Sequence, residues 1–510
     1  MDMKRQIIII VIIAATGLLF ANYQYTTLNY KIVGTNVTAC YDNLNVITCP
    51  VSSSAPFYGQ NQGITPSYQN NGNGTISDMN TGLMWIQARG VKVTWDSAFI
   101  LASQCNIGGF TDWRVPTIKE LYSLIDFNGR SAPTSNMCIP YIDSTFFGWK
   151  TGDTTIGERV IDAQDWSATK YKALTMQNDS TIFGVNFVDG RIKGYPQYQP
   201  GSNNTIKHKL YVRFVRGNTN YGINNFLDNG DSTITDNATG LMWSKNDSRI
   251  GMNWQSALAW VQTKNTANYL GYNDWRLPTA KELQSIVDYT RCKDFTNSAA
   301  IDPVFNTTQI SDEGGNVNWP FNWSNTTHRD NMGGVYVCFG ESLGWMKPMG
   351  LSYYILFDVH GAGAQRSDPK SGSYTNYFLG YNQSGQPVYG LGPQGDVIRI
   401  NNYVRLVRTA FTTGINNQEV ETSGSYKLNQ NFPNPFNPVT TISYYVPKSS
   451  LVKLTVFSLL GKEIETLLNE QKQAGYYTAK WNASNFPSGI YFCRMQAEGF
   501  KSDIKMILLR

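Results

Sequence analysis

The sequence predicts an α+β fold for most of the chain, with one module present twice, followed by a small β-sandwich. Three observations support this expectation: a helix-capping motif that occurs twice, further segments that recur in the same order, and a change to short alternating runs from residue 426 onward. The 510 residues are enough for about three domains.

The clearest repeat is Thr111–Leu121, which returns as Asn273–Leu283. Each copy contains a capping box, Thr117-x-x-Glu120 and Thr279-x-x-Glu282, in which the Thr and Glu side chains satisfy free amides at a helix start. Apolar side chains follow at helical spacing, which predicts one buried stripe on each helix. We expect the polar Lys119 and Lys281 to face away from that stripe.

Three further parts recur in the same order, and the offset between copies grows along the chain. In copy one they are Thr75–Trp85, Trp95–Ala98 and Val212–Arg216, and in copy two Thr233–Trp243, Trp254–Ala257 and Val404–Arg408. So long a period predicts tandem globular domains and not a solenoid. The growing offset places inserted loops in copy two between its capped helix and its last strand, and loops often carry function.

These patterns divide the chain into five segments. We expect a signal peptide at 1–21, a first domain with a cysteine-pinned N-terminal segment at 22–218 (copy one), a second domain at 219–410 (copy two), a linker at 411–425 and a β-sandwich at 426–510. The basic and apolar start is typical of a secretory signal, and an uncleaved anchor is the alternative. The apolar run is shorter than the roughly 20 residues of a membrane-spanning helix, so we expect no span after cleavage.

Composition indicates an extracellular, loop-rich protein. Charged residues make up 15% of the chain, against about a quarter in an ordinary soluble domain, and Tyr, Gly and Trp are abundant. A net charge of +5 over this length is too small to indicate a nucleic-acid partner.

Six of the seven cysteines lie in pairs close in sequence: Cys40 with Cys49, Cys105 with Cys138, and Cys292 with Cys338. Disulfides are typical of an exported protein, so we predict these three bridges, with Cys493 left over. A metal site is the alternative, but no C-x-x-C pair is present.

Two places could bind a metal ion. Asp228, Asp231 and Asp236 lie in one loop rich in oxygen donors, which makes calcium possible, although a turn held by Asx hydrogen bonds explains this loop and its copy-one equivalent more economically. The inserted part of copy two holds His328 and His360, which could share a divalent ion with Asp358 and Asp368.

The same inserted part offers other ligand contacts. Arg366 and Lys370 could bind an anion, and Trp323 and Trp345 could stack on sugar rings. The alternatives are that Gly and Pro shape a long loop in which His360 hydrogen-bonds, and that the tryptophans belong to the core. No catalytic motif stands out, so we expect no catalysis and no cofactor.

The motif before each capped helix has a structural interpretation. It consists of Asp112, Trp113 and Arg114 in copy one and Asp274, Trp275 and Arg276 in copy two. We expect a Trp packed beneath the helix start and an Asp–Arg pair that holds the loop.

The C-terminal part resembles the sorting domain of the type IX secretion system. The residues that carry this resemblance are Asn431–Ile442, Leu459–Glu463 and Pro487–Tyr491. The resemblance implies an immunoglobulin-like sandwich, the secretion machinery as a partner, and export to the surface of a Gram-negative bacterium. An ordinary fibronectin-like module is the alternative.

The repeated module resembles the C-terminal domain of the collagen-like adhesin Lcl, because both copies contain Thr-Gly-Leu-Met-Trp, Trp-x-x-Ala, Asp-Trp-Arg-x-Pro-Thr and Val-Arg-x-Val-Arg in this order. The Arg-x-Pro-Thr helix start is also similar to that of formylglycine-generating enzymes. The resemblance implies two tandem C-type-lectin-like domains that bind sulfated or otherwise acidic glycans or polymers at a cell surface. The late cysteine pair of those enzymes has no counterpart here. The alternatives are an extracellular enzyme that uses His328 and His360, and a structural surface component.

Overall fold

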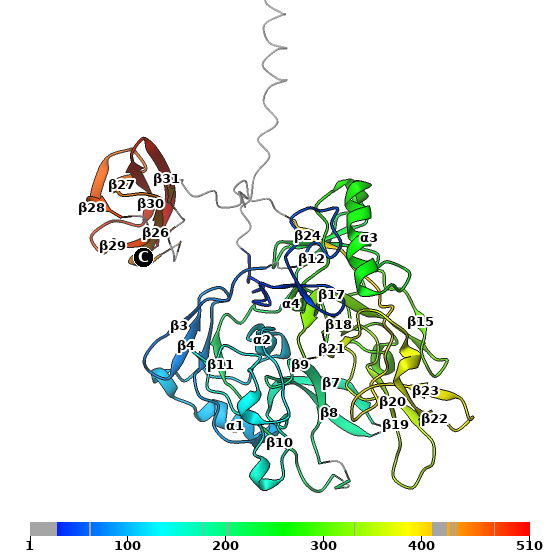
Figure 1. The fold of residues 1–510 in the computed structure, drawn as a ribbon. Coiled ribbons are helices and arrows are strands. Elements are labelled where there is room, and N and C mark those ends of the chain that lie inside the picture. The colour runs from blue at the N-terminus through cyan, green and yellow to red at the C-terminus, as the bar shows by residue number, and fades with distance from the viewer. Residues whose placement is uncertain are drawn as a thin grey trace, which may run out of the picture. The chain divides into compact units, whose positions relative to one another are not determined.

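The computed structural model describes residues 28–410, except 61, 62, 177, 200, 203 and 331, and residues 426–509, except 429, 430, 432, 433, 435 and 474. The expected signal peptide and the expected linker at 411–425 lie outside the described residues. The chain divides into two compact units, Met1–Phe411 and Thr412–Arg510 (Figure 1).

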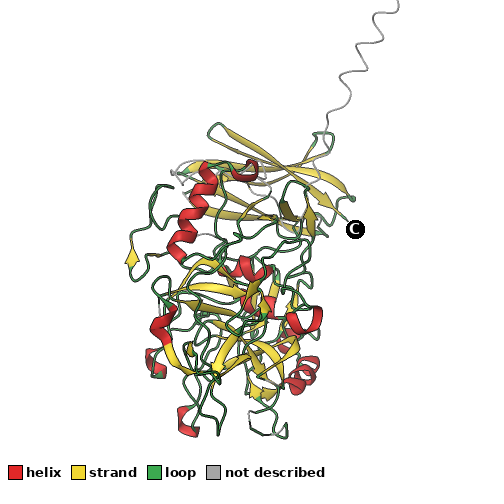
Figure 2. Cartoon of the chain, turned by 90° about the vertical axis from the view of Figure 1, so that its right-hand side faces the viewer, coloured by secondary structure: helices red, strands yellow, loops and turns green. Residues whose placement is uncertain are grey.

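The capped helices form where the sequence predicts them. Thr117 caps α2 (Ile118–Ser123) and Thr279 caps α4 (Ala280–Ser285), each through a complete capping box. Figure 2 shows that helices are few among the strands of the molecule. The other α-helices are α1 (Trp95–Gln104), α3 (Trp254–Thr266) and α5 (Lys293–Thr296), and the 3-10 helices are η1 (Ile107–Gly109), η2 (Ser135–Met137), η3 (Thr154–Ile156), η4 (Tyr269–Gly271) and η5 (Tyr374–Tyr377).

Each copy has its own four-stranded antiparallel sheet, in which the closing strand pairs with the Leu-Met-Trp strand. Copy one uses β11 (Val215–Gly217), β5 (Leu83–Ile86), β4 (Thr75–Asp78) and β3 (Tyr68–Asn70). Copy two uses β12 (Phe226–Asp228), β13 (Thr233–Asp236), β14 (Leu241–Ser244) and β24 (Val407–Thr409). A turn at residues 71–74 connects β3 and β4.

A six-stranded sheet joins the two copies. Its order is β17 (Phe321–His328), β18 (Gly333–Cys338), β21 (Gln365–Asp368), β9 (Arg191–Pro196), β8 (Asp179–Asn186) and β7 (Gln164–Thr175). Three strands come from each copy, and they meet where Gln365 of β21 lies opposite Ile192 of β9. The sequence predicted two separate tandem domains. In the structure the two copies instead build one compact unit.

The capped helices also join the two copies. Helix α2 contacts β7 and β8, α4 contacts β17 and β18, and the two helices contact each other. One core contains Leu121 and Ile125 of copy one together with Leu283 and Ile286 of copy two, so the predicted stripes are buried. The expectation that Lys119 and Lys281 face away was wrong, because Lys119 donates to the carbonyl of Ser285 and Lys281 to that of Ser123.

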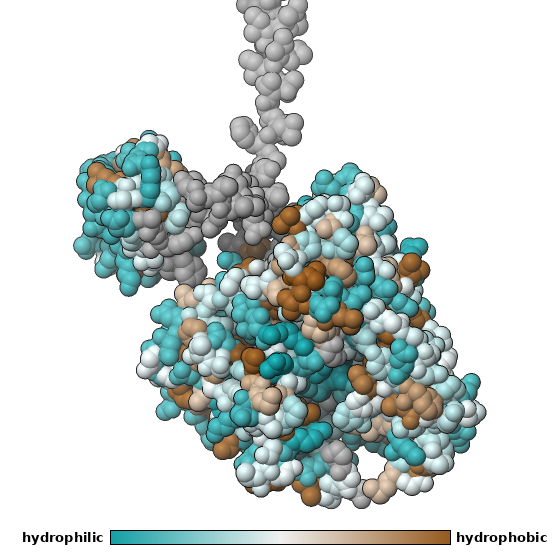
Figure 3. All heavy atoms as spheres, in the orientation of Figure 1, coloured by the Kyte–Doolittle hydropathy of each residue, from teal (hydrophilic) through white to brown (hydrophobic). Residues whose placement is uncertain are grey.

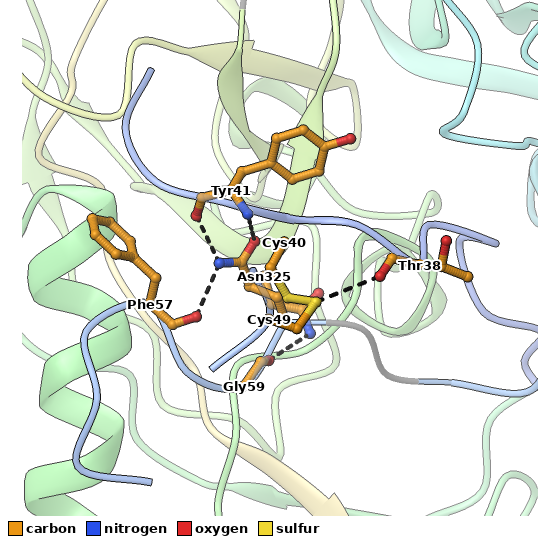
Figure 4. Close-up of a disulfide and its surroundings, with 8 residues drawn as sticks. Thr38, Cys40, Tyr41, Cys49, Phe57, Gly59 and Asn325 are labelled. Carbon is orange, nitrogen blue, oxygen red and sulfur yellow. Dashed lines mark hydrogen bonds between the residues drawn. A yellow bond between two sulfur atoms is a disulfide. The ribbon is translucent and has the colours of Figure 1, made fainter. Parts of the chain in front are cut away.

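The N-terminal segment, residues 28–64, lies against both copies and not against the first alone. Cys40 and Cys49 form the predicted disulfide, with their Cα atoms 5.0 Å apart (Figure 4). In copy two, the side-chain amide of Asn325 donates to the carbonyl of Gly59. In copy one, the amide of Phe127 donates to the carbonyl of Thr35. The segment contains β1 (Cys40–Tyr41) and β2 (Val46–Ile47).

The other two predicted disulfides are wrong. Cys105, Cys138, Cys292 and Cys338 are free thiols, as is Cys493. Cys292 belongs to the core shared by the copies, whereas Cys338 packs in a separate core beside α3. The closeness of Cys292 and Cys338 in sequence did not predict that the fold places them in different cores.

The inserted part of copy two consists of short hairpins between α4 and β24, where the growing offset predicted it. Its strands β19, β20, β22 and β23 gather on the right-hand side of Figure 1, with β15 above them. The pairs are β15 (Ile310–Ser311) with β16 (Val317–Asn318), β19 (Leu343–Met346) with β20 (Ile355–Asp358), and β22 (Phe378–Tyr381) with β23 (Pro387–Tyr389). In copy one, β6 (Val93–Thr94) pairs with β10 (Lys209–Leu210).

The C-terminal unit has two antiparallel sheets with one apolar core, as the alternating runs predicted. One sheet contains β25 (Lys427–Leu428), β26 (Val439–Val446) and β29 (Gly475–Asn482), and the other β28 (Glu463–Lys472), β27 (Ser450–Ser458), β30 (Gly489–Ala497) and β31 (Phe500–Leu508). Alternate residues of β27 are fully buried, and Trp481 lies in the same core.

Candidate functional site

The inserted hairpins of copy two enclose a pocket of about 490 Å³. Its walls combine aromatic, aliphatic and polar side chains in similar numbers. The aromatic residues are Phe321, Trp345, Tyr374, Tyr389 and Tyr403, the aliphatic ones Ile310, Pro320, Pro387, Val388, Val397 and Ile398, and the polar ones Ser311, Asp312, Glu313, Arg399, Asn401 and Asn402.

Backbone hydrogen bonds hold the pocket walls in place. The amide of Trp345 donates to the carbonyl of Gly395 at 2.8 Å, and the amide of Tyr403 donates to that of Phe321 at 2.9 Å. Gly344 permits the close approach of the loop before Val397, since a Cβ atom there would lie 2.5 Å from the carbonyl oxygen of Gln394. The walls are therefore attached to β17 and β19.

Arg399 is the central polar group of the pocket. Its Nε and Nη2 atoms donate to the two carboxylate oxygens of Glu313, at 2.8 and 3.0 Å. The guanidinium carbon lies 4.0 Å from the centre of the Phe321 ring. This fork-like pairing neutralises most of the charge of the cation and fixes its plane.

Asp368 supports the pocket loop from behind. Its Oδ2 atom accepts from the amide of Arg399 at 3.1 Å and from the side chain of Asn402 at 3.4 Å. Burial raises the pKa of Asp368 to about 6. Asp368 was predicted as a metal ligand, and in the structure its carboxylate accepts hydrogen bonds from this loop.

The two predicted sugar-stacking tryptophans lie in different environments. Trp345 lines the pocket and is 7% exposed. Trp323 is fully buried, and its indole nitrogen donates to the carbonyl of Met252 at 2.8 Å. Trp166 of copy one makes the same bond to Val93. The prediction that Trp323 stacks on a sugar ring was therefore wrong, because the repeated module buries this tryptophan in its core.

Arg366 and Lys370 do not form an open anion site. Lys370 is 1% exposed, donates to the carbonyl of Asp42 at 2.7 Å and lies 4.0 Å from the centre of the Trp254 ring. Burial lowers the pKa of Lys370 to about 7. Arg366 forms an ion pair with Asp396. The prediction was wrong because these cations are used inside the fold.

His328 and His360 are buried and have different partners. The Nε2 atom of His328 lies 2.8 Å from the carbonyl oxygen of Asp189, and that of His360 lies 2.9 Å from a carboxylate oxygen of Asp396. Burial lowers the pKa of His328 to about 4, and the nearby Arg191 acts in the same direction. Burial also lowers the pKa of His360. Both imidazoles are therefore neutral near pH 7.

The metal site predicted to join His328 and His360 to Asp358 and Asp368 does not assemble. Asp358 accepts hydrogen bonds from the hydroxyl of Tyr171 and the amide of Gly361. Burial raises the pKa of Asp358 to about 7, and the carboxylate of Glu341 adds to the effect. In the part of the chain that the structure describes, no group of three or more His, Cys, Asp or Glu side chains could hold a metal ion. The shared ion of His328, His360, Asp358 and Asp368 is thus contradicted.

In the loop predicted for calcium, the carboxylates form local turns. Asp228 accepts from the amide of Gly230 and pairs with Lys245, and Asp231 accepts from the amide of Thr233. Asp236 accepts from the amides of Asn225 and Ala238. These are the Asx turns of the alternative interpretation. Calcium at this loop stays a prediction.

The residues of the motif before each capped helix make the same contacts in both copies. Two hydrogen bonds of 2.6 Å join Arg114 to Glu120, and the same pair of bonds joins Arg276 to Glu282. Trp113 and Trp275 donate to the carbonyls of Ile107 and Tyr269. Asp112 and Asp274 pair with arginines of the closing strands, Arg216 and Arg408.

Sequence reasoning did not single out Arg399, Asn402 or Glu313. For Asn402 alone, a signal exists in the comparison of the copies. Asn402 lies opposite Met252, and the matching position in copy one is Leu210, which lies opposite Val93. A polar residue of copy two that replaces a buried leucine of copy one marks a difference between the copies.

Together, these features define a mostly β protein in which the second copy of a duplicated module carries a pocket among its inserted hairpins. Within that class, the chain belongs to the family of the Lcl C-terminal domain, whose model matches residues 74–216 and 232–355.

The C-terminal unit gives the location of the protein. Residues 430–509 match the secretion system C-terminal sorting domain. The protein is therefore exported and attached at the cell surface or outer membrane. Among the described residues, no helix is both long and apolar enough to cross a membrane.

Other comparisons add little. One solved structure, PorZ, a surface component of the type-IX secretion system of Porphyromonas gingivalis, is 12% identical, with a TM-score of 0.13 over 91% of this chain. The chain spans 61% of the length of that structure. No curated protein matches the chain.

Proposed function

We propose that this exported protein binds a glycan through the pocket in the inserted part of copy two, and that it does not catalyse a reaction. The observation that carries the proposal is a cavity of about 490 Å³ whose lining combines five aromatic residues with six polar ones. This size and composition are typical of small-ligand sites. Aromatic faces such as that of Tyr374 can pack against the apolar faces of sugar rings.

The charge of the pocket favours uncharged glycans over the sulfated or acidic glycans implied by the family resemblance. Arg399 is paired with Glu313, and Asp312 adds a second carboxylate to the lining. Figure 3 shows a mixed surface on the face in view, with apolar residues in scattered groups. Arg366 and Lys370, on which an anion site would depend, are held inside the fold.

Binding is favoured over catalysis because neither His328 nor His360 lines the pocket. Both imidazoles contact protein oxygen atoms instead. A structural role at the cell surface is the remaining alternative, and it would leave the pocket without a ligand. The C-type-lectin-like fold of the module and the immunoglobulin-like fold of the tail stay predictions.

A glycan array tests the proposal. The full-length exported protein is applied at low and at high salt to neutral, uronic-acid and sulfated glycans. We expect binding to neutral hexose-containing oligosaccharides that changes little with salt, because few charges are involved. Absence of binding to every glycan would contradict the proposal and favour a structural role.

A further inference from the structure

We propose that the loop Arg399–Asn402 is the specificity-determining subsite of this pocket, and that it recognises adjacent hydroxyl groups of an uncharged sugar. This inference rests on the proposed glycan binding. The recognising atoms are Nη1 of Arg399, which donates a hydrogen bond, and Oδ1 of Asn402, which accepts one.

The first observation is that both atoms are buried and unpaired. The side chain of Arg399 is 10% exposed, and Asn402 is 1% exposed. Within the described residues, neither Nη1 of Arg399 nor Oδ1 of Asn402 has a hydrogen-bond partner. Buried polar groups are almost always hydrogen-bonded in native proteins, so two unpaired atoms on residues that line one pocket point to a ligand that pairs with them.

The second observation is backbone strain in the same loop. Ile400, between the two recognising residues, has a φ of +56°, a conformation that is a genuine outlier for a β-branched residue. Asp368 holds the loop in this shape, because its Oδ2 atom accepts from the amide of Arg399 and the side chain of Asn402. Such strain persists only where the surroundings enforce it, and it gathers at ligand-binding sites.

The charges around the loop select the ligand class. Glu313 occupies Nε and Nη2 of Arg399, so only the Nη1 end of the guanidinium is left for a ligand. A carboxylate or sulfate at this end would also meet Glu313 and the acceptor oxygen of Asn402, which repel it. Hydroxyl groups both accept and donate hydrogen bonds, so a pair of them matches Nη1 and Oδ1 together.

Copy one lacks this subsite and therefore supplies the controls. Leu210 takes the place of Asn402, and its side chain is buried. Three residues earlier, at the position of Arg399, is Lys207, which pairs with the exposed Asp96. A change at Lys207 alters charge in the same part of the repeat without touching the pocket.

Calorimetry on the full chain tests the inference, with the neutral oligosaccharide that gives the strongest array signal as the probe. The variants are Asn402→Leu, which introduces the residue of copy one, and Arg399→Gln, with Lys207→Gln as the control. We expect Asn402→Leu and Arg399→Gln each to weaken binding roughly 5- to 10-fold, the usual effect of losing one hydrogen bond. Lys207→Gln should bind like the wild type.

Deoxy analogues of the same probe give a second measurement that does not depend on the folding of a variant. An analogue that lacks one of the recognised hydroxyls should bind the wild type more weakly, by a similar factor. In Asn402→Leu, the deoxy analogue and the parent probe should bind with nearly equal affinity, because the hydrogen bond to Oδ1 of Asn402 is already absent there.

The outcomes separate this inference from the proposed function. Glycan binding that is unchanged in both pocket variants, and equally strong for every deoxy analogue, overturns the subsite and leaves the proposed function standing. Binding restricted to sulfated glycans also overturns the subsite. Binding of no glycan at all overturns both.

Discussion

The ammonium group of Lys281 donates a hydrogen bond of 2.7 Å to the carbonyl oxygen of Ser123, across the boundary between the copies. The reciprocal bond, from Lys119 to the carbonyl oxygen of Ser285, measures 2.6 Å. Each capped helix is thus bonded to the last residue of the other. A cation is favourable at the C-terminal end of a helix, where carbonyl groups lack intrahelical partners. These two reciprocal hydrogen bonds join the copies into one structure.

The buried lysine predicts a pH-dependent stability. Burial lowers the pKa of Lys281 to about 7, whereas an unfolded lysine titrates near 10.4. Between these values the unfolded chain binds more protons, so the free energy of unfolding rises with pH. In Lys281→Met this contribution is absent. We expect the stability of the wild type relative to the variant to rise by roughly 1 kcal/mol per pH unit from pH 7 to 9.

Urea unfolding of both proteins at pH 7, 8 and 9 measures this difference. The comparison with Lys281→Met isolates one group, because other buried lysines, such as Lys193 and Lys370, also have a lowered pKa. If the stabilities of the two proteins changed in parallel with pH, Lys281 would not be buried as described.

The shared sheet predicts that one copy cannot fold as a monomer. Residues 22–218 alone would expose the edge of β9, which β21 covers in the full chain, together with the apolar face of α2. Exposed strand edges pair with other chains. We expect this fragment to dimerise through β9, aggregate or remain unfolded, as measured by sedimentation and circular dichroism. A stable folded monomer would contradict the fusion of the copies.

The thiol content distinguishes the single disulfide from the three predicted by sequence proximity. In denaturant without reductant, alkylation should label only the five free cysteines. After reduction, it should also label Cys40 and Cys49. Mass spectrometry gives the count directly. Closing this short loop contributes roughly 2–3 kcal/mol in the chain-entropy model, so Cys49→Ser should destabilise by about that amount, whereas Cys105→Ser should be nearly neutral. If only one thiol were labelled before reduction, the result would support the three disulfides predicted from sequence proximity.

The capping box predicts a smaller effect. The hydroxyl of Thr279 accepts from the amide of Glu282 at 3.2 Å, and Thr279 is 1% exposed. Thr279→Ala should destabilise the protein by about 1 kcal/mol, since an N-cap is lost. Thr266→Ala, at the exposed end of α3, is the matched control and should change stability by less than half as much. Denaturant midpoints of the two variants test the difference, and equal effects would argue against the cap.

Sequence reasoning succeeded where the structure is local. The capping boxes and the alternating strands of the tail depend on residues close in sequence, and all of them form. The pairing of β9 with β21 joins residues far apart in the chain, and neither strand is distinctive by itself. Lys281 was expected at the surface because its carbonyl partner on the other helix could not be seen from the sequence.

The site was predicted only in part, for a similar reason. Trp323 and Trp345 have the same side chain, but Trp323 has a counterpart in copy one, Trp166, and shares its core role. Comparison of the copies could have separated them. The pairing of Arg399 with Glu313 could not have been found this way, since it joins residues far apart in sequence within the inserted part.

The aromatic wall of the pocket gives a further prediction. Tyr374 is 49% exposed and packs edge-on against Tyr389, with ring centres 5.3 Å apart. Tyr374→Ala should therefore preserve the fold and weaken glycan binding roughly 10-fold, because a stacking surface is lost. Tyr353→Ala, outside the pocket lining, is a matched control for titration by calorimetry. Equal affinities for the two variants would contradict a contact at Tyr374.

Hydrogen exchange of the full chain, with and without the neutral oligosaccharide selected on the array, tests the central claim most directly. The account predicts slower exchange in the segments 310–321, 343–346, 374–389 and 397–403, which contain the residues that line the pocket, and little change in copy one. Protection confined to copy one, or no protection at saturating ligand, would contradict it.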